Sequence, residues 1–102
     1  MFIILYRWRI KADKEQQFIE AWAKATSYFL ENCDSLGSRL HRGSDGCFYA
    51  YAQWKSEADR ENAFTNSPDL DAGTKMMDAI EERFEPVILE KLADYLIFSA
   101  ES

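Results

Sequence analysis

The sequence has one histidine, two cysteines and no run of lysine or arginine. Because no basic cluster is present and the formal net charge is −6, a nucleic-acid partner is not expected. The apolar start of the chain extends for only about five residues before Arg7, which is too short for a signal peptide or a membrane span. We therefore expect a soluble, cytoplasmic protein with no membrane partner.

Common catalytic motifs are also missing. No serine lies in a GxSxG turn, no cysteine shares a motif with a histidine, and no glycine-rich phosphate loop is present. The carboxylates are scattered, and we interpret Asp78, Glu81 and Glu82 as a solvated helix face rather than a metal cluster. The sequence thus disfavours hydrolase, nucleotide and metal chemistry, and we expect no cofactor.

The two cysteines, Cys33 and Cys47, match neither a zinc-binding spacing nor a CxxC motif. A single disulfide stays open as an alternative. Two free thiols in a reducing cytoplasm are the simpler interpretation.

The segment from Ser35 to Trp54 predicts a β-hairpin. Two extended runs flank the turn Gly43-Ser44-Asp45-Gly46, and Asp-Gly is a favoured hairpin dipeptide. The run after the turn alternates with period two, which is typical of a strand with a different environment on each face. One face is expected to carry Phe48, Ala50, Ala52 and Trp54, and the other Tyr49, Tyr51 and Gln53.

The whole chain predicts one α+β domain over residues 1–98, followed by a short tail at 99–102. Besides the hairpin, the expected elements are a strand over 2–11, helices over 14–32, 57–65 and 68–84, and a strand over 87–98. Asp13, Ser56 and Ser67 are expected to cap the three helices, with Pro68 at the first position of the last one. The inward stripe of that last helix is expected to consist of Gly73, Met77, Ile80 and Phe84. This order is that of the ferredoxin-like fold, an antiparallel sheet with strand order 4-1-3-2 and helices on one face.

The sheet face without helices would expose aliphatic and tyrosine side chains, which favours a homodimer formed through that face. The residues expected there are Ile3, Leu5, Arg7, Arg9, Arg39, His41, Tyr49, Tyr51, Gln53 and Glu90. A solvated face in a monomer is the alternative. Residues Tyr95–Phe98 are too apolar to lie in water, so we expect them to pack on this chain or on a partner.

Three segments, MFIILYRWRIKADKEQQF, SLGSRLHR and AYAQWKSEADRENAF, occur in this order and spacing. Together they resemble the antibiotic biosynthesis monooxygenase-like family over about residues 1–98. The resemblance implies a dimeric α+β barrel made of two ferredoxin-like protomers packed sheet to sheet. Some members oxidise polycyclic phenols with molecular oxygen and neither metal nor flavin, in a pocket between sheet and helices. Others act on small signalling molecules or quinones, or have no demonstrated chemistry.

A further branch of this family degrades haem, and the resemblance argues against it here. Those members carry an asparagine on the first strand, a tryptophan near the end of the second helix and a haem-ligating histidine at the start of the third. The matching positions are Tyr6, Phe64 and about Gly73, and the only histidine is His41 on a predicted strand.

The helix-facing side of the predicted sheet gathers many aromatic side chains. They are interpreted either as ordinary core packing or as a flat apolar pocket for a planar aromatic ligand, with Gly73 opening space. The candidate substrate-binding residues are Tyr6, Trp8, Trp22, Phe48, Trp54, Phe64 and Met77.

No catalytic residue is clearly indicated, and the candidates are Tyr6, His41 and Arg39. Tyr6 offers a phenol to a ligand, and His41 is the only histidine, the side chain that most often serves as a general base. By strand parity, however, His41 and Arg39 belong to the expected dimer face, where His41 would pair with a neighbour. Arg7 and Arg9 are candidates for oxyanion stabilisation or for interface ion pairs.

Two functions remain open from the sequence. The first is a cofactor-independent monooxygenase of a small phenol or quinol, whose deprotonated form itself gives an electron to oxygen. The second is a non-catalytic dimer that binds a small aromatic molecule or serves a structural role. A cavity of roughly 300 Å³ or more on the helix side of the sheet would support a ligand site.

Overall fold

The computed structural model describes residues 1–66 and 71–97. Its elements are β1 (Phe2–Ile10), a 3₁₀ turn (Ala12–Lys14), α1 (Glu15–Asn32), β2 (Ser35–Arg42), β3 (Phe48–Trp54), α2 (Glu57–Asn66), α3 (Asp71–Ala79), β4 (Ile80–Arg83) and β5 (Val87–Leu89). The strands form one antiparallel sheet in the order β2-β3-β1-β4, and β5 also pairs with β1. The predicted ferredoxin-like α+β fold is confirmed, with β1 and β3 in the middle of the sheet.

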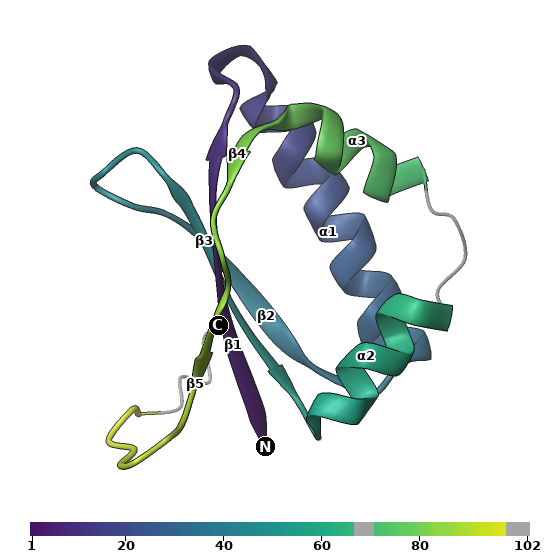
Figure 1. Ribbon diagram of the computed structural model, residues 1–102, viewed down its shortest axis with the longest axis vertical. Helices are drawn as coiled ribbons and strands as arrows, with labels where there is room; N and C mark the ends of the chain where they lie inside the picture. Colours follow the sequence, from purple (N-terminus) through teal and green to yellow (C-terminus); the bar gives the residue numbers. More distant parts are fainter. Residues whose placement is uncertain (67–70, 98–102) are drawn as a thin grey trace.

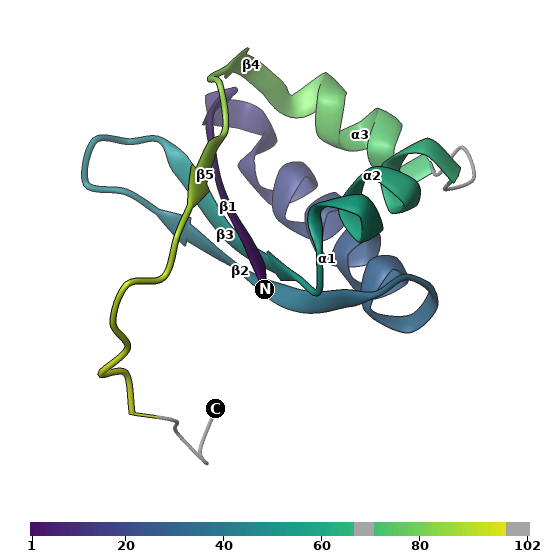
Figure 2. The same ribbon diagram turned by 60° about the horizontal axis from the view of Figure 1, so that its bottom comes forward.

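All three helices lie on one side of the sheet, as expected (Figure 1). The other side carries none of the helices of residues 1–66 and 71–97, and we call it the open face. After β5 the chain runs away from the helical layer (Figure 2). None of the helices in the described ranges is both long and apolar enough to span a bilayer.

The core lies between α1 and the two central strands. Phe18 of α1 is fully buried and meets Trp8 and Phe48 edge-on, at ring centroid distances of 5.1 and 5.7 Å. The alternation of β3 is strict, and its residues from Phe48 to Trp54 are buried at every second position. This confirms that the period-two pattern of the hairpin separates a helix-facing side from an open side.

The side chain of Asp45 connects the hairpin turn to residues of the open face. One carboxylate oxygen accepts the backbone N–H of Cys47 at 2.9 Å, and the other accepts the hydroxyl of Tyr49 and lies 3.5 Å from Arg7. The Tyr49 hydrogen bond, then the Cys47 N–H and the charge of Arg7, hold the pKa of the Asp45 carboxyl below its usual value. Gly43 must be small here, because a Cβ atom would lie 2.5 Å from the Tyr49 ring.

The lowered pKa of Asp45 predicts a pH-dependent stability. A carboxyl with a lower pKa in the folded state contributes stability above its unfolded value of about 4, and loses it as the pH falls through the folded value. Asp45→Asn should therefore melt at a lower temperature than the wild type at pH 7, and the difference should close toward pH 3. Thermal denaturation followed by circular dichroism measures this.

The matched control is Asp13→Asn, since the Asp13 side chain is exposed and makes no hydrogen bond to the described residues. Its melting temperature should follow that of the wild type at every pH. A difference for Asp45→Asn that stays constant between pH 7 and pH 3 would contradict the assigned role.

The predicted helix caps have different outcomes. Ser56 caps α2 as expected, because its Oγ accepts the N–H of Asp59 at 3.1 Å. The cap at Asp13 is wrong, since Asp13 lies inside the 3₁₀ turn and Lys14 precedes α1 without a side-chain cap. The cap at Ser67, with Pro68 after it, lies outside the described residues.

The helix expected over 68–84 ends at Ala79, and Ile80–Arg83 is strand β4 instead. Glutamate and arginine in this segment favour a helix, but pairing with the free edge of β1 satisfies the backbone and overrides that preference. The inward stripe predicted for this helix is therefore wrong in its second half, because Ile80 lies on β4 and Phe84 follows that strand. On α3 the buried residues are Ala72 and Ala79, whereas Met77 is 66% exposed.

The final strand is also shorter than predicted. It covers only Val87–Leu89 rather than 87–98, and residues 90–97 form no regular structure. Leu92, Tyr95, Leu96 and Ile97 are 86–94% exposed, so the expected packing of this segment on its own chain is wrong for the described residues. Phe98 and the tail 99–102 lie outside them.

Candidate functional site

A cavity of about 710 Å³ lies between the sheet and the helices. On the sheet side, the cavity is lined by Ser38 of β2 and Ala52 of β3, which are paired. Their short side chains leave the space above the sheet empty. On the helical side, Gly73 of α3 lines the cavity, and a Cβ atom there would meet nothing within 4 Å. Small residues on facing elements thus leave a volume within the range of roughly 300–1,000 Å³ that is typical of ligand sites.

Most of the predicted binding residues surround this cavity. Its lining includes Tyr6, Trp8, Trp22, Trp54, Phe64 and Met77. The exception is Phe48, which is 2% exposed, packs against Phe18 in the core and does not reach the cavity. Trp8 and Trp54 are themselves almost completely buried, so they act as core and as cavity wall at once.

Tyr6 and Arg60 form the polar contact of the cavity. The Nε–H of Arg60 donates to the Tyr6 hydroxyl at 2.7 Å. The guanidinium also lies over the Phe64 ring, 4.5 Å from its centroid. Tyr6 in turn stacks on Trp8, with ring centroids 5.5 Å apart and planes 8° from parallel. The sequence interpretation missed Arg60, although its position four residues before Phe64 on α2 places both on one helix face.

The environment of Tyr6 determines what its hydroxyl can do. Burial raises the pKa of the phenol above its usual value, although the Arg60 hydrogen bond and the charges of Arg60 and Arg83 act in the opposite direction. The hydroxyl is therefore neutral near pH 7. Because its oxygen accepts from Arg60, its proton is available to a ligand oxygen in the cavity.

The edge of the sheet is interrupted beside Tyr6. Trp8 pairs with Arg83 and Leu5 with Val87, so the two β1 residues between them face three residues, 84–86. Pro86, which has no N–H to donate, is one of these three and lines the cavity. The break separates β4 from β5 and leaves an irregular edge where the cavity reaches the border of the sheet.

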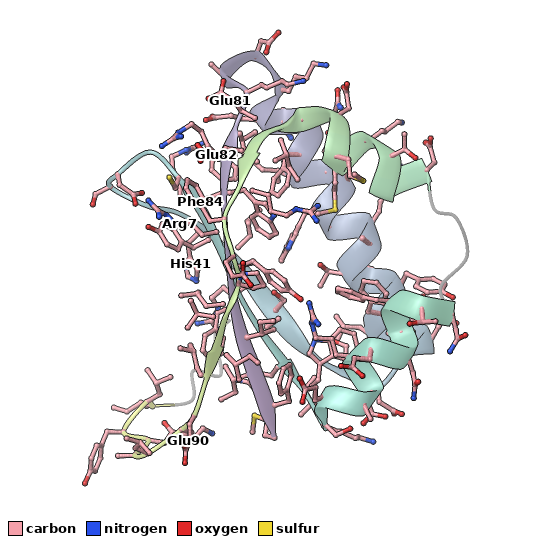
Figure 3. The ribbon with its side chains drawn as sticks, viewed as in Figure 1. Arg7, His41, Glu81, Glu82, Phe84 and Glu90 are labelled. Atoms are coloured by element: carbon pink, nitrogen blue, oxygen red, sulfur yellow. The ribbon has the colours of Figure 1, made fainter. Side chains whose placement is uncertain are left out.

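The other catalytic candidates lie on the opposite side of the sheet. His41 and Arg39 are exposed on β2, where they pair with Tyr49 and Tyr51 across the open face. His41 lies on the helix-free side together with Arg7 (Figure 3). The structure therefore does not bring His41 or Arg39 together with Tyr6.

Arg7 and Arg9 form ion pairs within their own chain. Arg7 pairs with Asp45, and Arg9 pairs with Glu82 on the neighbouring β4. Both guanidinium groups also lie near the Phe84 ring, with Arg7 4.2 Å from its centroid. Neither arginine is directed at the cavity.

Metal-ligating groups do not gather anywhere in the ranges 1–66 and 71–97, where no three His, Cys, Asp or Glu residues come together. Cys33 and Cys47 are both free thiols. The chemistry that the cavity itself offers is that of aromatic rings, a phenol, serine and threonine hydroxyls and guanidinium groups.

The comparison with known families decides the identity of the fold. Residues 1–75 match the family model described as antibiotic biosynthesis monooxygenase, or ABM. The chain belongs to the ABM family. No curated protein sequence matches the chain.

Solved structures of low sequence identity share the ABM fold. SnoaB from Streptomyces nogalater, described as a cofactor-independent oxygenase, superposes with a TM-score of 0.77 at 14% identity, over 92% of this chain and 95% of its own. A Nitrosomonas europaea protein provisionally named an antibiotic biosynthesis monooxygenase gives 0.75 at 19% identity, over 91% and 100%. Rv0793 from Mycobacterium tuberculosis gives 0.74 at 9% identity, over 93% and 98%. At these identities the likeness shows the fold alone.

Proposed function

We propose that this ABM-family protein is a cofactor-independent monooxygenase that acts on a small phenol or quinol. The observation that carries the proposal is the aromatic cavity of about 710 Å³ with the Tyr6–Arg60 contact in its wall. The description of SnoaB as a cofactor-independent oxygenase supports it, since that protein shares the fold.

The cavity is suited to a planar ligand. The stacked rings of Tyr6 and Trp8, together with Trp22 and Phe64, give the cavity aromatic walls. Aromatic surfaces of this kind bind flat rings by burial and stacking. A phenol or quinol of two or three fused rings therefore fits the shape and the polarity of the site.

The chemistry needs an activated substrate rather than an activated cofactor. The deprotonated substrate gives an electron to molecular oxygen, and the hydroxyl of Tyr6 and the charge of Arg60 stabilise the substrate oxyanion. With an anthrone, the ring CH₂ becomes C=O with one oxygen atom, and the other leaves as water with both hydrogens. All the electrons come from the substrate, so the balance needs no further reductant.

The lining of the cavity includes no histidine or carboxylate among the described residues. A general base is therefore not supplied by that lining, and the substrate would lose its proton to solvent. We expect the rate to rise with pH toward the pKa of the substrate phenol. The same observation favours the second candidate function, a protein that binds an aromatic molecule without turnover.

Oxygen uptake separates the two functions. The purified protein is assayed with a panel of anthrones, anthrols and quinols in the presence of a chelator and without flavin. We expect uptake well above the protein-free rate for at least one member. Binding of panel compounds with uptake no faster than the blank would favour the non-catalytic function.

The open face supports a dimer as part of this proposal. Leu5 and Tyr51 are neighbours in the register at its centre and are half-buried, and Val87, also on this face, is 53% exposed. Arginines and acidic groups lie around them, as in the pair of Arg9 with Glu82, so the patch can be complementary to itself. We propose that two copies pack through this face, with the exposed segment 90–97 contacting the partner.

We also propose a cytoplasmic location, because Cys33 and Cys47 are free and a reducing compartment keeps thiols free. Fractionation of cells that express the tagged full chain tests this. Recovery in an exported or membrane fraction would contradict it.

A further inference from the structure

The charge of the cavity is unlike that of the chain. The protein carries a net charge of −6, yet the only charged residues among the described lining are two arginines, Arg60 and Arg83. Positive charge within apolar walls attracts an anionic ligand, since the low local dielectric strengthens the interaction. The cavity therefore has more positive charge than the binding of a neutral aromatic molecule requires.

Arg83 is not neutralised by any of the residues that the structure describes. Arg7 and Arg9, which come from the other face of the neighbouring strand β1, both pair with carboxylates. Arg83 forms no ion pair or side-chain hydrogen bond within the described part of the protein. Arg39 also forms no ion pair or side-chain hydrogen bond with the described residues, but it lies on the open face, away from the cavity.

The two arginines of the cavity have different positions. Arg60 is half-buried and donates a hydrogen bond to the Tyr6 hydroxyl, so its charge can stabilise a ligand oxygen that lies beside Tyr6. Arg83 is exposed at the end of β4, directly opposite Trp8 and beside the interrupted sheet edge. A ring bound in the cavity beside Tyr6 and Trp8 would therefore have Arg83 next to its outer end.

We propose that the ligand is an aromatic acid, whose ring occupies the cavity and whose carboxylate is bound by Arg83 at the rim. This inference rests on the function proposed for the site and adds a second anionic group to the phenol. A guanidinium binds a carboxylate through two parallel hydrogen bonds, which gives orientation as well as affinity. The acid would hold the ring with its phenol directed inward, toward Tyr6 and Arg60.

Equilibrium binding of matched ligand pairs tests the carboxylate site. The probes are naphthalene-2-carboxylate and anthracene-2-carboxylate, each compared with its neutral carboxamide at pH 7.5 by quenching of the tryptophan fluorescence. The wild type should bind at least one acid about tenfold more tightly than the amide. Arg83→Gln should remove this preference without weakening the binding of the amide, and Arg83→Lys should keep part of it.

The control variant is Lys24→Gln, which removes one positive charge from the exposed surface of α1 and should leave the preference unchanged. The proposal is overturned if the wild type binds acid and amide equally, if it binds neither, or if Arg83→Gln keeps the preference. Loss of the preference in Arg83→Gln, with no oxygen uptake for any phenol, would support the carboxylate site and reject the oxygenase. Oxygen uptake without a preference for acids would support the oxygenase and reject the carboxylate site.

Discussion

Replacement of Tyr6 by Phe, or of Arg60 by Gln, is expected to lower kcat for an anthrone substrate by about 100-fold. Tyr6→Phe removes only the hydroxyl, because the stacking of the ring on Trp8 does not involve it. Arg60→Gln removes the charge that lies 2.7 Å from that hydroxyl. Initial rates of oxygen uptake, measured at several substrate concentrations, give kcat and KM separately.

The dependence on pH distinguishes anion stabilisation from a structural role. If Arg60 stabilises the substrate oxyanion, the rate of Arg60→Gln should recover as the pH rises and the substrate ionises without help. A variant that is merely misfolded would not recover. Arg60→Lys, which keeps the charge but loses the planar fork, should lie between the wild type and Arg60→Gln.

Tyr51→Phe is the matched control for Tyr6→Phe. It removes a tyrosine hydroxyl from the neighbouring strand β3, but on the open face, where that hydroxyl only accepts a long hydrogen bond from Gln53 at 3.4 Å. Its activity should stay within about twofold of the wild type. Rates for Tyr6→Phe and Arg60→Gln that are equally close to the wild type would exclude these two residues from the chemistry.

The second large effect concerns assembly. The wild-type protein is expected to sediment at micromolar concentration as a dimer of the 11.9 kDa chain. Leu5→Glu places a charge at the centre of the open face, where Leu5 pairs with Tyr51 and Val87. An unpaired charge buried in an interface costs several kcal/mol, so this variant should sediment as a monomer.

The control for Leu5→Glu is Ala23→Glu, which adds the same charge to an exposed position on α1. It should sediment as the wild type does. A wild type that is monomeric at these concentrations would reject the dimer, and a dimeric Leu5→Glu would show that the open face is not the interface.

The parts of the fold that could be predicted are those whose signal is local. The hairpin follows from Asp45-Gly46 and from the strict alternation of β3, since a turn dipeptide and a period of two need no distant partner. The long amphipathic helix α1 was likewise readable from the spacing of its apolar residues. These elements sufficed to predict the order of the sheet.

Strand β4 could not be predicted from the residues that form it. The segment Ile80–Arg83 is rich in helix-forming residues, and it becomes a strand because β1 offers a free edge at this position. Phe84, which was expected in the inward stripe of a helix, lies instead directly after β4 at the edge of the sheet. There its ring contacts Arg7 on the open face.

The candidate site was predicted in its apolar part and missed in its charged part. Parity placed Tyr6, Trp8 and Trp54 on the helix-facing side, because strand periodicity fixes which residues share a face. The contact of Tyr6 with Arg60 joins residues 54 positions apart, and no local sequence pattern predicts such a contact. Arg83 was missed because its strand was taken for a helix.

The proposed oxygenase takes the oxygen atom of its product from molecular oxygen, in the helix-side cavity and without a cofactor. Mass spectrometry of the quinone formed from an anthrone under ¹⁸O₂, with chelator present and no flavin, tests it most directly. We expect one ¹⁸O atom in the quinone at a rate far above the protein-free reaction, and loss of that excess in Tyr6→Phe and Arg60→Gln. A labelled quinone that forms no faster with the wild-type protein than without it would rule out the proposed oxygenase.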